Sequence, residues 1–203
     1  MDYWNDIVTE KSWNILQKIK KLPIKFILIG GWAAYLWTKL HKSKDIDIIV
    51  RNFDDLNYLK KNYELRKNDN LKKYEIKIGD IDIDIYVPHY SKLAIPAEEA
   101  ARHSTKIQNF DVVLPEILLI LKQGAEKDRE DSIKGLKDRV DIVTLLLFSE
   151  INFKNYRELL EKFKLTAFRE RLKKTLLNFK DISYLGLNPR EFKLRKEKII
   201  KQI

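Results

Sequence analysis

The stretch FILIGGWAAYLWTKLHKSKDIDIIV, residues 26–50, decides the fold. Its apolar start predicts a short buried strand over residues 24–29, and the apolar segment 32–40 predicts a buried helix. A second strand is expected over residues 44–50. Within it Asp45 and Asp47 stand two apart, and alternate residues of a strand share one face. The stretch therefore predicts two carboxylates on one face of a strand.

The same alternation returns in IGDIDIDIYV, residues 78–87, where Asp80, Asp82 and Asp84 alternate with isoleucines. If the two strands are neighbours, three or more carboxylates converge, and one pKa must rise unless a cation intervenes. Magnesium suits such a set because it takes one or two carboxylates and fills its shell with water and phosphate oxygens. The alternative is an amphipathic strand with one wet face. Aspartate is a poor strand former, so the pattern favours a site.

Gly30 and Gly31 separate the first strand from the helix. Backbone N–H groups and the positive end of a helix favour phosphate at such a turn, and glycine lets the phosphate approach closely. The pair alone is more typical of a tight turn without a ligand, and it does not have P-loop or Rossmann spacing. In combination with the Asp-x-Asp strand, however, it places a phosphate cradle and a carboxylate pair at one end of a small unit.

The character of the chain changes near residue 114. Before this point the pattern alternates between helices and strands, with helices at 2–21 and 53–61, a short helix opened by Ile95-Pro96, hairpins at 64–67 with 74–78 and at 105–107 with 111–114, and a strand at 81–87. After it the pattern predicts only helices, at 115–127, 133–148, 155–164, 167–179 and 189–202. We therefore expect an α+β protein, with a small mixed sheet and flanking helices in residues 1–114 and an all-helical region, 115–203, packed on it.

The composition points to an anionic partner. The 203 residues carry a formal net charge of +10, which favours nucleic acid or a nucleotide, although lysines also keep a protein soluble. The charged fraction of 34% is typical of thermophiles. The absence of cysteine excludes disulfides, zinc–thiolate sites and a thiol nucleophile. The N-terminal segment lacks the apolar stretch of a signal peptide and no apolar run is long enough to span a membrane, so we expect a cytoplasmic protein without membrane contact.

These motifs resemble the nucleotidyltransferase superfamily typified by DNA polymerase β. The signature is a hydrophobic residue, two small residues, a gap, Asp-x-Asp and a third carboxylate on a neighbouring strand; here Ile29, Gly30-Gly31, the gap 32–44, and Asp45 with Asp47 match it. The third carboxylate would be Asp84 or Asp82, and Asp84 is favoured because IDIYV is the most strand-like part of its segment. Within the superfamily the chain is most similar to the branch of AbiEii-type toxins and related uncharacterised nucleotidyltransferases.

The resemblance implies a role for each matched residue. Asp45, Asp47 and Asp84, with Asp82 as the alternative, would bind two Mg²⁺ ions, and the third carboxylate would also deprotonate the acceptor hydroxyl. The triphosphate of a nucleoside triphosphate would be bound by four residues, Gly30, Gly31, Ser43 and Lys44. Two-metal sites of this kind clamp both the attacking and the leaving oxygen of a phosphoryl group.

A second motif of that branch lies in the helical half, as a lysine, an arginine and Lys-Asp-x-x-Asp. Here Lys122, Arg129 and residues 137–141 match it. Lys122 would neutralise phosphate charge as a catalytic clamp. Asp138 and Asp141 lie three apart on one helix face. We interpret them as structural residues, or as partners of Arg129 or Lys134, rather than as metal ligands.

The leading hypothesis is thus a metal-dependent transfer of a nucleoside monophosphate to an RNA, such as tRNA, or to a protein hydroxyl. This hypothesis includes the case in which the protein is a toxin that has an antitoxin protein as its partner. The alternatives are a catalytically inactive nucleotide- or RNA-binding protein of the same fold, and a carboxylate-dependent nuclease. A nuclease would not need Gly30-Gly31 ahead of a helix.

Overall fold

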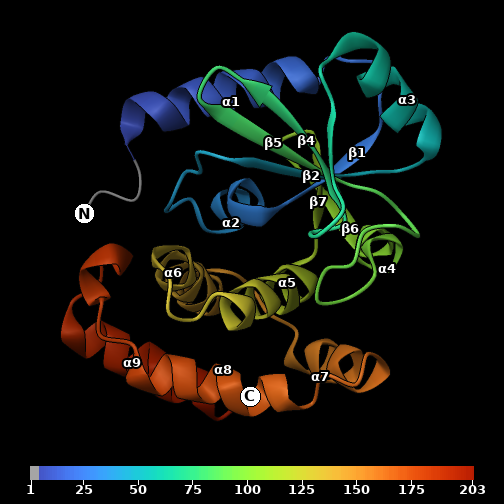
Figure 1. The fold of residues 1–203 in the computed structure, drawn as a ribbon. Coiled ribbons are helices and arrows are strands. Elements are labelled where there is room, and N and C mark those ends of the chain that lie inside the picture. The colour runs from blue at the N-terminus through green and yellow to red at the C-terminus, as the bar shows by residue number, and fades with distance from the viewer. Residues whose placement is uncertain (1–4) are drawn as a thin grey trace. The chain divides into compact units, whose positions relative to one another are not determined.

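The computed structural model describes residues 5–203, and the chain divides into two compact units, Met1–Leu114 and Pro115–Ile203 (Figure 1). The described part of the first unit is built on a seven-stranded mixed sheet with strand order β3-β4-β5-β2-β1-β7-β6. The second unit is helical throughout its regular elements. The expected α+β class, with a mixed sheet followed by helices, is confirmed.

The strands are β1 (Phe26–Ile29), β2 (Ile46–Val50), β3 (Arg66–Asn68), β4 (Lys73–Ile78), β5 (Ile81–Tyr86), β6 (Ser104–Ile107) and β7 (Phe110–Val113). The helices of the first unit are α1 (Asp6–Ile19), α2 (Gly30–Thr38), α3 (Phe53–Asn62) and α4 (Ala97–Arg102). Those of the second are α5 (Pro115–Asp128), α6 (Ile133–Phe148), α7 (Phe153–Lys162), α8 (Ala167–Asn178), the 3₁₀ turn η1 (Ile182–Leu185) and α9 (Pro189–Ile200).

The helix boundaries follow from local chemistry. Asn side chains accept backbone N–H groups at the starts of α1 and α3, which satisfies amides that have no partner inside the helix. Asn188 and Glu191 form a capping box at α9. Pro115 begins α5, where its missing N–H costs nothing. Of these signals, Pro115 predicted a helix start in the sequence, and α5 begins at that residue.

The sheet brings the two acidic strands together. β2 lies between β1 and β5, antiparallel to the first and parallel to the second. The isoleucines that alternate with the aspartates are buried, and Ile48, Ile83 and Ile85 line an apolar pocket together with Ile19 of α1 and Leu59 of α3. Because successive side chains of a strand point to opposite faces, the aspartates of β2 and β5 face away from these two helices.

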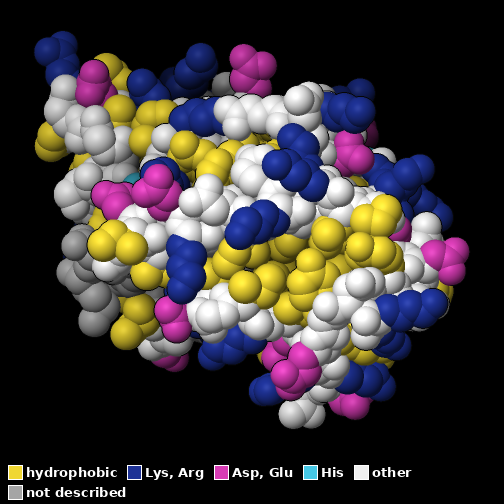
Figure 2. Space-filling view, turned by 90° about the horizontal axis from the view of Figure 1, so that it is seen from above, with side chains coloured by type: hydrophobic (Ala, Val, Ile, Leu, Met, Phe, Trp, Pro, Cys, Tyr) yellow, Lys and Arg dark blue, Asp and Glu magenta, His cyan; other side chains and the backbone are white. Residues whose placement is uncertain are grey.

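Helices α1 and α3 run along one side of the sheet in Figure 1. Figure 2 looks down on the molecule from above that orientation and shows hydrophobic side chains gathered on this face, with Lys and Arg side chains beside them. Ile7 and Phe53 are exposed large hydrophobic residues of these two helices.

Three details differ from the expectations. Helix α2 begins at Gly30, directly after β1, rather than at residue 32, and Gly30 itself adopts φ +67°. Strand β2 begins at Ile46, so Asp45 precedes it. The turn η1 was not expected. Of the expected N-terminal helix, residues 2–4 lie outside the described residues.

None of the helices in the described part combines the length and the apolar composition that crossing a membrane requires.

Candidate active site

A row of side chains crosses the sheet on the face opposite α1 and α3. Asp47 of β2 pairs in register with Asp84 of β5, and Asp84 pairs on its other side with Glu75 of β4. On the opposite side of β2, Asp47 pairs with Ile29, the last residue of β1. Register partners share a face, so the row joins three carboxylates to the start of α2. The two acidic strands are neighbours, so the condition under which their carboxylates converge is met.

Gly30 makes room for Asp47. A Cβ atom on Gly30 would lie 2.0 Å from Oδ2 of Asp47, and the φ of +67° is one that glycine adopts without strain. The carboxylate therefore rests against the backbone at the first residue of α2. The close contact between the Asp47 carboxylate and the backbone requires a glycine at position 30, whether or not a ligand binds there.

Gly31 has a similar relation to Ser43. A Cβ atom on Gly31 would lie 2.5 Å from the Ser43 hydroxyl oxygen, and Ser43 is buried. Because the two glycines have no side chain, the start of α2 can lie in contact with Ser43 of the following loop and with Asp47 of β2. Lys44, the neighbour of Ser43, is exposed.

Lys73 of β4 is the residue of this site that the sequence analysis missed. Its Nζ lies 2.6 Å from Oδ2 of Asp84 and 3.1 Å from Oε1 of Glu75, and its side chain is 11% exposed. Asn68 Nδ2 donates to Glu75 at 3.0 Å. The alternation of Lys73 and Glu75 in KYEIKI places both on one face, but the register that brings them to Asp84 depends on the folded sheet.

The electrostatics of this row are unbalanced at Asp84. Burial, and then the neighbouring charge of Asp47, raises the pKa of Asp84 to about 6, against the opposing effect of Lys73. Burial alone would lower the pKa of Lys73, but the hydrogen bonds and charges of Asp84 and Glu75 together outweigh it and raise that pKa. Asp84 can therefore exchange a proton near neutral pH.

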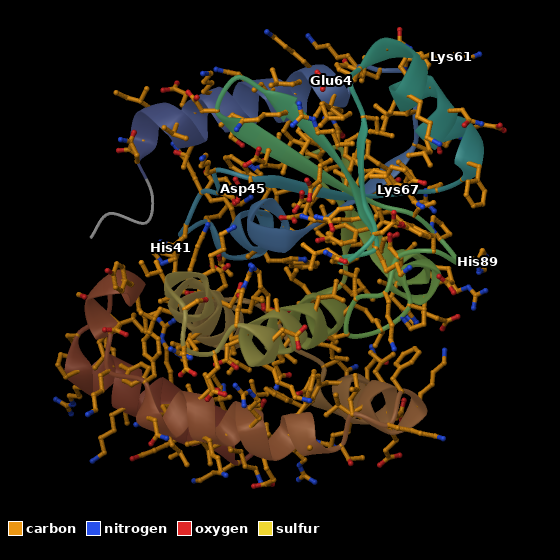
Figure 3. The ribbon with its side chains drawn as sticks, in the orientation of Figure 1. His41, Asp45, Lys61, Glu64, Lys67 and His89 are labelled. Atoms are coloured by element: carbon orange, nitrogen blue, oxygen red, sulfur yellow. The ribbon has the colours of Figure 1, made fainter. Side chains whose placement is uncertain are left out.

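The remaining predicted carboxylates lie at the margins of the row. Asp45 is partly exposed and lies just before β2, at the end of the loop from α2 (Figure 3). Asp82 is exposed and pairs in register with Lys77. The register therefore places Asp84, and not Asp82, beside Asp47.

The histidines labelled in Figure 3 lie apart from each other. His41 is in the loop between α2 and β2, whereas His89 follows β5 and its Nδ1 is 3.3 Å from Glu98. Between residues 5 and 203, no three His, Cys, Asp or Glu side chains form a metal-binding group by themselves.

Lys122 lies in the second unit, in a buried cluster of charges. Its Nζ is 2.6 Å from Oδ2 of Asp141 and 3.3 Å from Oδ1 of Asp138, and Arg129 Nε is 2.6 Å from Oδ2 of Asp138. Both carboxylates are almost completely buried. The interpretation of Asp138 as a partner of Arg129 agrees with this geometry; for Lys122, the ion pairs give a structural role that accounts for its burial.

Asp47 fits a magnesium ion as part of its ligand set. Asp84 lies beside Asp47 and adds negative charge, but its Oδ2 already accepts a hydrogen bond from Lys73 Nζ at 2.6 Å. Magnesium uses one or two protein carboxylates and completes its octahedron with water and phosphate oxygens. Asp47 next to the start of α2, with Asp45 two residues earlier in the chain, is consistent with that need.

No family model matches the chain, and no curated protein matches it. Among solved structures, JHP933 from Helicobacter pylori covers 98% of this chain and 94% of its own, with 13% identity and a TM-score of 0.53. The structure of a "putative nucleotidyltransferase" from H. pylori covers 98% of this chain and 96% of its own, with 14% identity and a TM-score of 0.52. The chain has the nucleotidyltransferase fold.

At these identities the likeness concerns the fold, so the roles of individual residues depend on the geometry described above. Both likenesses extend over nearly the whole chain. The helices after residue 152 are therefore part of the shared fold. The AbiEii-type branch stays a prediction.

Proposed function

We propose that this chain is a magnesium-dependent nucleotidyltransferase, which moves a nucleoside monophosphate from a nucleoside triphosphate to an acceptor hydroxyl. The observation that carries the proposal is the packing of the Asp47 carboxylate against Gly30, with Asp84 as its register neighbour. This arrangement joins a carboxylate pair to the start of a helix within a nucleotidyltransferase fold.

The start of α2 supplies the phosphate site. Its first backbone N–H groups have no partner inside the helix, and Ile29, the residue before it, has no side-chain oxygen with which to cap them. Phosphate oxygens can accept these hydrogens, and the positive end of the helix favours the negative charge. Gly30 and Gly31 present no side chain that would keep the triphosphate away.

The carboxylates divide the remaining tasks. Asp45 and Asp47 would hold magnesium, which when bound offsets charge on the phosphates and the leaving pyrophosphate. Asp84 would take the proton of the acceptor hydroxyl, and a pKa of about 6 suits a base that works near neutral pH. The acceptor oxygen then forms a bond to the α-phosphorus as the bond to the β-phosphate oxygen breaks, and pyrophosphate leaves.

RNA is the proposed acceptor because the chain carries a net charge of +10. A protein hydroxyl is the alternative acceptor. The resemblance to AbiEii-type toxins extends the proposal to a toxin that an antitoxin restrains. This role predicts that expression of the wild-type chain arrests bacterial growth, and that the Asp47→Asn variant does not.

The first experiment incubates the protein with magnesium, each α-labelled nucleoside triphosphate in turn and cellular RNA. We expect label in RNA or in protein from the wild type, and at least about a hundredfold less from Asp47→Asn and Asp84→Asn. Asp80→Asn is the matched control, because Asp80 belongs to the same acidic run but is exposed and pairs with Lys11. Asp82→Asn tests directly which carboxylate is the third.

Other outcomes would redirect the proposal. RNA cleavage without consumption of triphosphate would indicate the carboxylate-dependent nuclease. Magnesium-independent RNA binding with no label from any triphosphate would indicate the inactive binding protein. Equal label from wild type and Asp47→Asn would remove Asp47 from the site.

A further inference from the structure

Lys73 places a fixed cation among the carboxylates of the site. It lies on β4, two strands away from Asp47, and its buried side chain brings Nζ within 2.6 Å of Asp84 and 3.1 Å of Glu75. A lysine that is buried with two carboxylates is held there by charge as well as by packing. The ammonium is therefore part of the site's architecture rather than a surface charge.

A second metal ion at Asp84 would compete with this ammonium. Magnesium binds carboxylate oxygens at about 2.0–2.1 Å, and such an ion on Oδ2 would meet the positive charge of Nζ, which already donates to that oxygen. Glu75, the nearest other carboxylate along the row, is engaged by Lys73 and by Asn68. Asp47 lies on β2, on the side of Asp84 that is away from β4, and Asp45 immediately precedes that strand.

On the basis of the proposed function, we propose that the site holds one magnesium ion, on Asp45 and Asp47, and that the Lys73 ammonium takes the place of a second ion at Asp84. Lys73 is then a positioning residue: it holds the Asp84 carboxylate toward the acceptor and offsets part of the charge of the row. The two ions implied by the family resemblance become one ion and one lysine.

The test counts bound Mn²⁺, which replaces magnesium and has an electron paramagnetic resonance signal. Protein loaded with one equivalent of a non-hydrolysable nucleoside triphosphate is titrated with Mn²⁺, and bound ions are counted from the loss of the free-ion signal. We expect one ion per wild-type chain and two in Lys73→Met, with spin coupling between the two ions. Lys73→Arg keeps the charge and should bind one.

Lys77→Met is the matched control, because Lys77 is an exposed residue of the same strand, and it should bind one ion. Two ions in the wild type would overturn the inference and leave the proposed function intact. One ion in both wild type and Lys73→Met would overturn it as well. No ion in either protein would count against the proposed function itself. If Lys73→Met does not fold, the wild-type count alone decides between one ion and two.

Discussion

Gly30 and Asp47 occupy a space that admits only one side chain. We predict that Gly30→Ala destabilises the fold by more than the cost of a left-handed backbone alone, which is about 1–2 kcal/mol, because its Cβ would collide with the Asp47 carboxylate. Either α2 or Asp47 must move, so transferase activity should also fall. Urea unfolding and the label assay measure the two effects.

Gly79→Ala is the control for this change. Gly79 also has a positive φ, of +60°, but its Cβ would meet only the flexible end of Lys11. Gly79→Ala should lower the stability only by the cost of the left-handed backbone and should keep its activity. Equal destabilisation by the two substitutions would mean that Asp47 does not need the space beside Gly30.

Asp84 gives the site a pH dependence. Its pKa in the folded protein is about 6, above the usual 3.8, so proton binding favours the folded state between these values and the free energy of unfolding falls as the pH rises through them. The difference corresponds to on the order of 3 kcal/mol. The stability of Asp84→Asn relative to the metal-free wild type should therefore be higher at pH 7.5 than at pH 4.5 by about 2 kcal/mol, because the unfolded chain has already lost most of this proton at pH 4.5.

Urea unfolding in EDTA at the two pH values measures this difference, and carboxyl NMR gives the pKa of Asp84 directly. In Asp47→Asn the same pKa should be lower, because the charge of Asp47, one of three causes that raise it together with burial and the charge of Glu75, has been removed. A carboxyl that titrates near pH 4 in the wild type would refute the proposed electrostatics of the row.

At the scale of the elements, the buried ion pairs between α5 and α6 make Lys122 a stability residue. Removing the lysine leaves Asp138 and Asp141 buried with less compensating charge, so Lys122→Met should cost about 3–5 kcal/mol. Adding Asp141→Asn to that variant should recover part of the loss. Lys127→Met, at an exposed position of the same helix, should change the stability by less than about 0.5 kcal/mol.

Urea unfolding of the four proteins measures these effects. The outcome also decides how the phosphate-clamp prediction for Lys122 can be tested. If Lys122→Met is as stable as the wild type, a loss of activity in this variant can be attributed directly to a role of Lys122 in catalysis. A destabilised one requires that any loss of activity be corrected for the unfolded fraction.

The element order was largely predictable because its signals are local. Alternating Ile and Asp define β2 and β5, and Pro115 marks the start of α5. Which strands are neighbours was stated only as a condition, because pairing between distant strands is set by the whole sheet. Lys73 was missed for that reason: only the register of β4 against β5 brings it to Asp84.

Gly30 and Gly31 also show what local sequence patterns can and cannot predict. Their position between a strand and a helix is a recognisable motif, and it predicted a phosphate site. Their contacts with Asp47 and Ser43 depend on how the chain returns after α2, and no local pattern encodes that return.

At the scale of the whole molecule, the excess of positive charge should govern RNA binding. Each phosphate that Lys or Arg neutralises releases counterions, so a complex with three such contacts to a single strand should weaken about twentyfold between 50 and 200 mM salt. Fluorescence anisotropy with a labelled single-stranded RNA measures this slope. Asp47→Asn should show the same slope, because it changes the chemistry and not the basic surface. Affinity that does not depend on salt would argue against RNA as the acceptor.

The raised pKa of Asp84 has a consequence for laboratory evolution of this protein. At neutral pH the charge of Asp47 beside Asp84 is a cost to the fold, so a library screened for heat resistance alone would enrich an amide at position 47, which leaves the ion pair of Lys73 with Asp84 in place. Under the proposed function, such clones would survive higher temperatures and transfer nothing. A screen for a robust enzyme would have to reward turnover in every round, since the most heat-resistant variants and the active ones would carry different residues at position 47.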